Sequence, residues 1–272
     1  MSDATADRTM PLLDHLIELR RRLFYSFIAF ILAFFICFYF AGDVFDFLVR
    51  PLADVWDDSQ DRRLIYTAMH EKFFTDVKIG LFAGAFVAFP MVAAQIWMFM
   101  APGLYRNEKR AFIPFLVVTP ILFLMGASFV YYVVLPVAWS FFAGFEQIGS
   151  TGNLAIELEP KVNEYLSLVM RLIFAFGISF ELPVIISLLA RAGLVTPDGL
   201  AAKRRYSVVL AFVAAAVLTP PDPVSQLALA VPIILLYEIS IVCARIIARR
   251  QDARATAYEA GIDPNDPEGG EK

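Results

Sequence analysis

Four acidic side chains lie beside basic residues or within apolar sequence, where a negative charge needs an explanation. A carboxylate at a membrane surface can accept two hydrogen bonds from the planar guanidinium of an arginine. A carboxylic acid inside a membrane can hold or release a proton. The chemistry open to this chain is therefore recognition of a cation or handling of a proton, and the acids to weigh are Glu18, Glu108, Glu181 and, before a predicted span, Asp222.

Two of these acids have a simple structural explanation as well. Glu18 lies four residues before Arg22, the spacing at which an ion pair stabilises a helix by ~0.3–0.5 kcal/mol. Beside Arg20, Arg21 and Arg22, it is either this helix ion pair or a docking point for a positively charged partner. Glu108 lies in a short basic turn, where a solvated surface charge explains it.

The other two acids lie in or next to predicted membrane spans. Glu181 is either a neutral acid hydrogen-bonded to an adjacent helix or part of a polar, proton-sensitive translocation surface. Gln95, in another apolar segment, is one possible neighbour. Asp222 directly precedes Pro223 and predicts an N-cap for the next helix. Gln226 follows one turn later, and its amide needs a partner in an apolar helix.

The sequence lacks the motifs of nucleotide hydrolases, zinc peptidases and serine hydrolases. Its two histidines, His15 and His70, are predicted on opposite sides of a membrane and cannot share one site. We therefore expect no enzyme activity, no metal site and no cofactor, so that any transport must draw its energy from elsewhere. The net charge of −4 gives no basic field for nucleic acid.

Composition places the chain among membrane proteins. Apolar residues make up 59% of the sequence and charged residues only 18%, whereas a soluble domain has about 25% charged residues. Several apolar segments reach the length of about 18 residues that indicates a membrane-spanning helix. The sequence therefore predicts an all-α integral membrane protein with six spans at residues 23–41, 73–99, 112–138, 164–190, 206–219 and 224–244.

The segments around these spans predict further helices. Residues 12–24 have an amphipathic pattern, typical of a short interfacial helix leading into the first span. Residues 42–72 are polar but contain apolar pieces, which favours short amphipathic helices broken at Pro51. At ~1.5 Å per residue, the span at 206–219 reaches only about 21 Å. With the span at 224–244 we expect it to form a short hairpin that thins the bilayer.

Basic residues predict the orientation of the chain. Lys and Arg concentrate in the N-terminus, the turn at 100–111, the loop at 191–205 and the tail. By the positive-inside rule both termini are cytoplasmic, which requires an even number of spans. We expect a membrane domain over residues 12–250, with disordered ends at 1–11 and 251–272.

Several motifs occur together, in order, at fitting places in this layout. With them the chain resembles the TatC family, the multispanning subunit of the twin-arginine protein translocase, over residues 11–250. The motifs are His15-Leu16-Ile17-Glu18-Leu19-Arg20, Phe73-Phe74 with Lys78, Ala101-Pro102-Gly103-Leu104-Tyr105 with Glu108 and Arg110, Ser179-Phe180-Glu181-Leu182-Pro183, and Leu218-Thr219-Pro220-Pro221-Asp222 with Ser225-Gln226.

The resemblance implies a concave, glove-like bundle of six helices in the cytoplasmic membrane. It implies that the chain binds signal peptides with two consecutive arginines and helps transport folded proteins, driven by the proton-motive force. The implied partners are the single-span proteins TatA and TatB, membrane lipid and further copies of this chain within the complex. By the same resemblance, Glu18 and Glu108 bind the arginines, with Arg20, Phe99 and Tyr105 beside them.

The resemblance also assigns two further sets of residues. One is an intramembrane polar patch facing partner helices, and the other shapes the periplasmic cap and the concave face. An alternative to the whole scheme is a proton- or ion-coupled small-molecule transporter with its ion site at Glu181. That class predicts inverted repeats, and no clear internal repeat is visible in the sequence. The polar patch comprises Glu181 and Gln226, and the cap comprises Pro51, Pro90, Tyr131 and Asp222.

Overall fold

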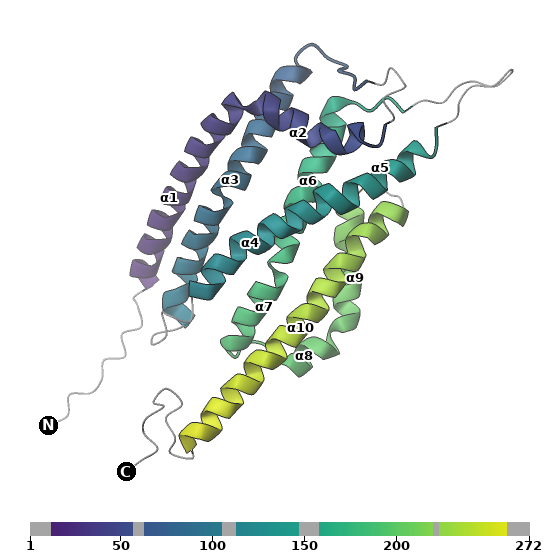
Figure 1. The fold of residues 1–272 in the computed structure, drawn as a ribbon. Helices are drawn as coiled ribbons and strands as arrows, with labels where there is room; N and C mark the ends of the chain where they lie inside the picture. The colour runs from purple at the N-terminus through teal and green to yellow at the C-terminus, as the bar shows by residue number, and fades with distance from the viewer. Residues whose placement is uncertain (1–11, 57–62, 105–112, 147–157, 220–222, 260–272) are drawn as a thin grey trace, which may run out of the picture. The chain divides into compact units, whose positions relative to one another are not determined.

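The computed structural model describes residues 12–56, 63–104, 113–146, 158–219 and 223–259. All regular elements in these ranges are helical, apart from an isolated bridge between Ile65 and Lys161, which confirms the predicted all-α class (Figure 1). The helices are α1 (Leu12–Tyr39), α2 (Ala41–Ala53), α3 (Glu71–Leu104), α4 (Ile113–Phe129), the π-helical η2 (Val130–Val134), α5 (Leu135–Ala143), α6 (Val162–Phe180), α7 (Leu182–Arg191), α8 (Pro197–Ala202), α9 (Arg204–Leu218) and α10 (Pro223–Glu259).

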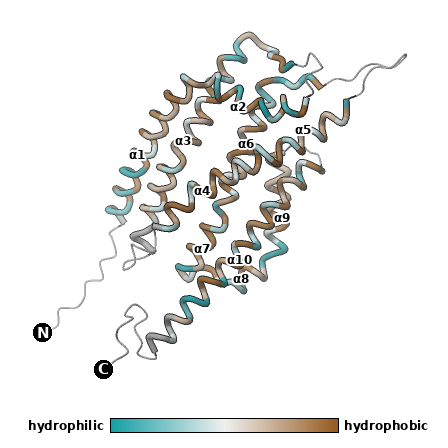
Figure 2. Tube along the Cα trace, in the orientation of Figure 1, coloured by the Kyte–Doolittle hydropathy of each residue, from teal (hydrophilic) through white to brown (hydrophobic). Residues whose placement is uncertain are grey.

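Five stretches of the described residues are long and apolar enough to cross a membrane, and they match five of the six predicted spans. The remaining predicted span corresponds to α9, which has 15 residues and reaches about 22 Å, short of a ~30 Å hydrocarbon core. Figure 2 shows hydrophilic residues at the first turns of α1 and on α10 just before its grey end. The five stretches are Leu13–Tyr39, Glu71–Phe99, Pro114–Ala143, Val162–Arg191 and Pro223–Ala253.

The chain divides into two compact units. The first comprises residues 1–50, 63–120 and 160–166, and the second comprises residues 51–62, 121–159 and 167–272. In the first unit α1 packs along α3, and the pair is antiparallel because the start of α1 meets the end of α3. The predicted interfacial helix and first span are thus one continuous helix, α1.

Two glycines on α3 allow α1 to approach closely. A Cβ atom at Gly84 would lie 2.7 Å from the Cα atom of Phe34, and one at Gly80 would lie 3.0 Å from the Cβ atom of Phe38. Membrane helices lack a hydrophobic driving force between them and rely on such close backbone packing. The glycines at 80 and 84 therefore fix the α1–α3 contact that carries Glu18.

We expect Gly84→Ala to destabilise the protein by about 1–2 kcal/mol, because the new methyl group meets the backbone of Phe34. Thermal unfolding of the purified protein in detergent measures this, at about 2–4 °C per kcal/mol. Gly42→Ala in α2 is the matched control, since no heavy atom lies within 4 Å of its added Cβ. Equal melting temperatures for the two variants would contradict the proposed packing.

The segment after α1 differs from its prediction at Pro51. This proline was expected to break any helix, yet α2 includes it and ends at Ala53. Pro51 is buried in the last turn of α2, where a missing backbone donor interrupts only the end of the helix. In the first unit the hydroxyl group of Tyr165 donates to the carbonyl oxygen of Leu48 at 2.9 Å and ties α6 to α2.

The predicted span at 112–138 is not a regular α-helix throughout. It is interrupted by η2, where the N–H of Leu135 donates to the carbonyl of Val130, five residues back. Pro136 follows at the start of α5 and cannot donate to the preceding turn. The wider π-helical turn accommodates this missing bond, as π-bulges commonly do.

The predicted span at 164–190 is also two helices. α6 ends at Phe180, and α7 begins at Leu182, so Glu181 lies at the break. Pro183, in the first turn of α7, has no N–H to continue the α6 ladder. The N–H of Glu181 instead donates to the carbonyl of Ile178 at 3.0 Å, three residues back.

Within the second unit, α4 and α6 each present a glycine to an aromatic residue of the other helix. A Cβ atom at Gly126 on α4 would lie 2.6 Å from the carbonyl oxygen of Phe176 and 2.9 Å from the ring of Phe180. A Cβ atom at Gly177 on α6 would lie 2.5 Å from the ring of Phe123. This reciprocal contact, the Gly126–Gly177 crossing, holds the two helices at backbone distance.

α10 is longer than its prediction. It continues past residue 244 to Glu259, into the segment 251–272 that was expected to be disordered. Residues 245–259 lack proline and glycine and are rich in Ala and Arg, which favour helix. α10 packs against α9 and α7, so the predicted short hairpin is an unequal pair in which only α9 is short.

Candidate functional site

The start of α1 carries the expected ion pair between Glu18 and Arg22. The Nε atom of Arg22 donates to Glu18 Oε1 at 2.9 Å, and a second guanidinium nitrogen contacts the same oxygen. Arg22 also donates to Oε1 of Gln95 on α3 at 3.4 Å. The side chains of Arg22 and Glu18 are only 18% and 12% exposed. The local prediction of a helix ion pair is therefore confirmed.

The second carboxylate oxygen of Glu18 differs from the first in its hydrogen bonding. Glu18 Oε2 is buried and has no hydrogen-bond partner among the described residues. A buried carboxylate oxygen without a donor costs free energy, which a donor from a ligand can recover. Glu18 is thus held by Arg22 through one oxygen and can accept a further cationic donor through the other.

An aromatic contact flanks this carboxylate. The rings of His15 on α1 and Phe99 on α3 stack with centroids 4.2 Å apart and an interplanar angle of 17°. Phe99 is half-buried, and Arg20 is exposed on α1. The contact brings the end of α3 to the start of α1, so Phe99 lies at the same end of the helix pair as Glu18. We call His15, Glu18, Arg22, Gln95 and Phe99 the α1–α3 site.

Two members of the predicted site, Tyr105 and Glu108, lie outside the described residues. The structure therefore leaves the pairing of Glu18 with Glu108 a prediction. Asp222 lies outside them as well, and with it the predicted cap of α10. Sequence reasoning missed the role of Gln95, which it considered near Glu181. The sequence indicated only that the amide of Gln95, in an apolar span, needs a hydrogen-bond partner; it did not identify Arg22.

The predicted intramembrane patch is in the second unit. Glu181 is 6% exposed at the α6–α7 break, so its own chain covers it. Gln226 on α10 donates to the carbonyl oxygen of Phe212 on α9 at 3.4 Å. The amide therefore contributes to the α9–α10 contact. That these two residues face partner helices stays a prediction.

Three residues of the predicted cap lie among the described residues, in different surroundings. Pro51 is buried in α2, whereas Pro90 is exposed within the continuous helix α3. Tyr131 is buried in η2. Their shared role in a periplasmic cap and a concave face stays a prediction.

A charge pair in the second unit was missed by sequence reasoning. Arg204, the first residue of α9, donates from Nε and Nη2 to the two carboxylate oxygens of Glu238 at 2.7 and 2.8 Å. Glu238 lies inside the predicted span 224–244. An acid within an apolar span needs a partner, and this was the feature of the sequence that could have predicted the pair. The fork joins the start of α9 to the middle of α10.

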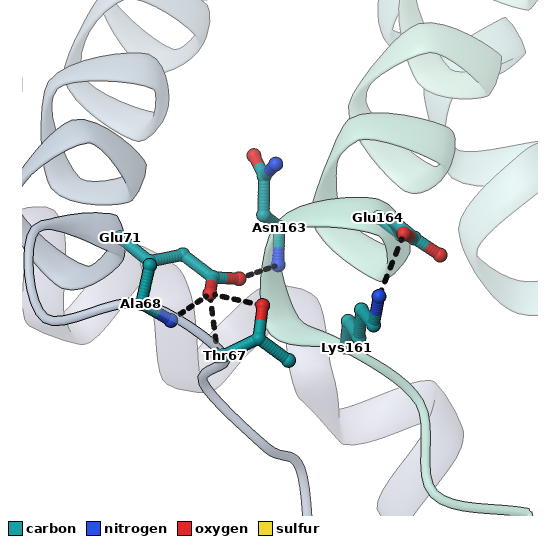
Figure 3. Close-up of polar contacts among 6 residues, drawn as sticks. All are labelled: Thr67, Ala68, Glu71, Lys161, Asn163 and Glu164. Carbon is teal, nitrogen blue, oxygen red and sulfur yellow. Dashed lines mark hydrogen bonds and ion pairs between the residues drawn. The ribbon is translucent and has the colours of Figure 1, made fainter.

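A polar junction ties α3 to α6 in the first unit (Figure 3). The carboxylate of Glu71 accepts from the N–H of Thr67 at 2.7 Å, the N–H of Ala68 at 3.2 Å and the N–H of Asn163 at 3.4 Å. The hydroxyl group of Thr67 donates to it as well, at 3.1 Å. Among the described residues, no group of three or more His, Cys, Asp or Glu side chains could hold a metal ion.

Comparisons with known proteins decide the family. The family model described as "Sec-independent protein translocase protein (TatC)" matches residues 14–232. The chain belongs to the TatC family. A relative with the same description from Magnetococcus marinus is 50% identical over 254 residues, covering 93% of this chain and 91% of the relative. The Escherichia coli K12 TatC is 39% identical and covers 89% of this chain and 90% of its own length.

A solved structure supports the same assignment. The crystal structure of the twin arginine translocase receptor TatC has a TM-score of 0.75 and 42% identity, and it covers 86% of this chain and 99% of its own. Membership in the TatC family makes this chain a multi-pass inner-membrane subunit of the Sec-independent protein translocase, not an enzyme. It also decides against the alternative of a small-molecule transporter.

Proposed function

We propose that this TatC-family chain is the receptor for twin-arginine signal peptides and that Glu18 binds one of the two arginines. The observation that supports this most is the half-satisfied carboxylate: Arg22 engages Oε1, while buried Oε2 has no hydrogen-bond partner among the described residues. Glu108 binds the second arginine, with Arg20 and Tyr105 beside the peptide and Phe99 forming an apolar wall.

The proposed ligand fits the chemistry of the α1–α3 site. Arginine remains charged and presents several N–H donors in one plane, which suits a carboxylate already held in a fixed orientation. Lysine keeps the charge but lacks the fork. Arg22 has two effects: it orients Glu18, and it repels basic segments that cannot supply a better contact with the carboxylate.

The proposed receptor works with its N- and C-termini in the cytoplasm. Basic residues at the start of α1 and in the last turns of α10 support this orientation through the positive-inside rule. TatA- and TatB-type proteins are the proposed partners, in a complex that contains several copies of this chain. The proton-motive force is the proposed energy source, which agrees with a sequence that has no nucleotide-binding motif.

We expect Glu18→Gln to weaken binding of a twin-arginine peptide about tenfold, ~1.4 kcal/mol, because a neutral amide replaces a charge-assisted acceptor. Equilibrium binding of a fluorescent peptide to the purified protein measures this effect. Glu164→Gln is the matched control, because it makes the same change at an exposed residue on α6. The same peptide with two lysines should bind the wild type about as weakly as the twin-arginine peptide binds the variant.

Wild-type affinity in Glu18→Gln, with the Glu164→Gln control also unchanged, would overturn the assignment of Glu18. A twin-lysine peptide that binds as tightly as the twin-arginine peptide would overturn the proposed selectivity for arginine. Thermal unfolding of each variant shows whether a loss of binding comes from a loss of fold.

A further inference from the structure

A pocket of about 420 Å³ in the first unit lies where α3 and α6 begin. It is distinct from the α1–α3 site, because Phe99 reaches that site from the far end of α3. Both polar and apolar side chains line it, among them Glu71, Phe74, Lys78, Lys161, Asn163 and Glu164.

The carboxylates among the described lining residues already have partners. Glu71 accepts hydrogen bonds from the segment at Thr67 and from the backbone of Asn163 (Figure 3). Glu164 pairs with Lys161 at 3.7 Å at the rim, where both side chains are largely exposed. Among the described lining residues, both acids are thus engaged by groups other than Lys78, whose side chain is exposed.

Lys78 is the charge that this junction does not neutralise. Its Nζ atom donates to Oδ1 of Asn163 at 2.5 Å, a neutral acceptor. An ammonium group has three protons to donate, so two remain for a ligand. The residue lies inside the membrane-spanning stretch Glu71–Phe99, where a cation is costly unless an anion or water meets it. The pocket thus places a positive donor within a membrane span.

The depth and the walls of the pocket indicate what kind of anion fits. Lys78 lies two turns beyond Glu71, about 10 Å along the helix. The headgroup layer is about 5–7 Å thick on each side of a bilayer. With Glu71, the first residue of the stretch, at the outer surface of this layer, Lys78 lies close to the border between headgroups and hydrocarbon. Phe74 lines the pocket and is exposed, as is the neighbouring Phe73. A ligand with an anionic head and apolar chains would meet both surfaces.

We propose that this pocket binds the headgroup of a glycerophospholipid. The ammonium group of Lys78 donates to the phosphate diester, the amide nitrogen of Asn163 adds a neutral donor, and the acyl chains pass along Phe74. The aromatic wall and the membrane depth of Lys78 favour a lipid over a free phosphate ion. The orientation proposed above places the lipid in the periplasmic leaflet, and only that leaflet assignment rests on the proposed function.

Native mass spectrometry of the detergent-purified protein with added phosphatidylglycerol tests this site. We expect Lys78→Gln to lower lipid binding about tenfold, ~1.4 kcal/mol. Glutamine keeps a donor for Asn163 but loses the charge, so the variant should stay folded. Lys72→Gln, on the same helix but outside the pocket lining, is the matched control and should bind like the wild type. Asn163→Asp places a negative charge beside the phosphate and should also weaken binding.

Three comparisons separate the lipid from other ligands. Diacylglycerol, which has no phosphate, should bind weakly to every variant, and equal binding would overturn the recognition of phosphate. Competition by millimolar inorganic phosphate would show an anion site without lipid specificity. Equal losses in Lys72→Gln and Lys78→Gln would show a general charge effect. Because lipid binding is measured without cargo or partners, a negative result here leaves the signal-peptide proposal untouched.

Discussion

Gly126→Ala is expected to destabilise the protein by about 3 kcal/mol, at the upper end of what overpacking costs. The added methyl group would lie 2.6 Å from the carbonyl oxygen of Phe176 and 2.9 Å from the ring of Phe180. A backbone oxygen cannot turn aside as a side chain can, so α4 and α6 must separate. Thermal unfolding in detergent should show a loss of about 2–4 °C per kcal/mol.

Gly177→Ala provides an internal comparison on the opposite helix. Its methyl group would meet the ring of Phe123 at 2.5 Å, which is a side chain and can be shortened. Adding Phe123→Leu should therefore recover part of the loss, with a coupling above ~0.5 kcal/mol. Adding Phe180→Leu to Gly126→Ala should recover little, because the carbonyl of Phe176 remains. Equal rescue of both glycine variants would contradict the distinction between backbone and ring contacts.

Glu181→Ala is expected to lower transport of a folded reporter about a hundredfold, equivalent to ~2.7 kcal/mol. The physical reason is that the change removes a buried polar group at the α6–α7 break. Glu181→Gln should retain most transport, because an amide keeps a polar group of nearly the same shape at this buried position. Export of the reporter from cells, normalised to the amount of the variant in the membrane, measures this.

The same variants should leave signal-peptide binding unchanged, because Glu181 lies in the second unit and the α1–α3 site lies in the first. Normal transport by Glu181→Ala would contradict the predicted role of this residue in a polar translocation surface. Loss of transport in both variants would indicate that a charge, rather than a neutral acid, is needed there. Loss of peptide binding together with transport would indicate a general folding defect.

Apolar length predicted the membrane spans well, whereas the positions of prolines do not tell which spans are interrupted. Pro90, Pro120 and Pro232 lie inside continuous α-helices. Pro136 and Pro183 instead accompany a π-helical turn and a helix break. All five remove one backbone donor in the same way. Which of them interrupts a helix depends on the packing around it, and a single sequence does not contain that information.

The candidate site was predictable to the extent that its contacts are local. The ion pair of Glu18 with Arg22 follows from helix geometry, because side chains four residues apart share a face. The contact from Arg22 to Gln95 joins residues 73 positions apart and depends on how α1 packs on α3. The stacking of His15 on Phe99 depends on the same packing. Long-range partners of this kind require the fold.

The Gly126–Gly177 crossing limits which motions can open a path for a transported protein. Each helix contributes one glycine and an aromatic residue that fills the space above the other glycine. Sliding α4 by one turn along α6, about 5.4 Å, would bring side chains with Cβ atoms to positions that accept only hydrogen. The crossing therefore has a single register and behaves as a fixed pivot. Transport must use rearrangements elsewhere in the protein that keep this crossing intact.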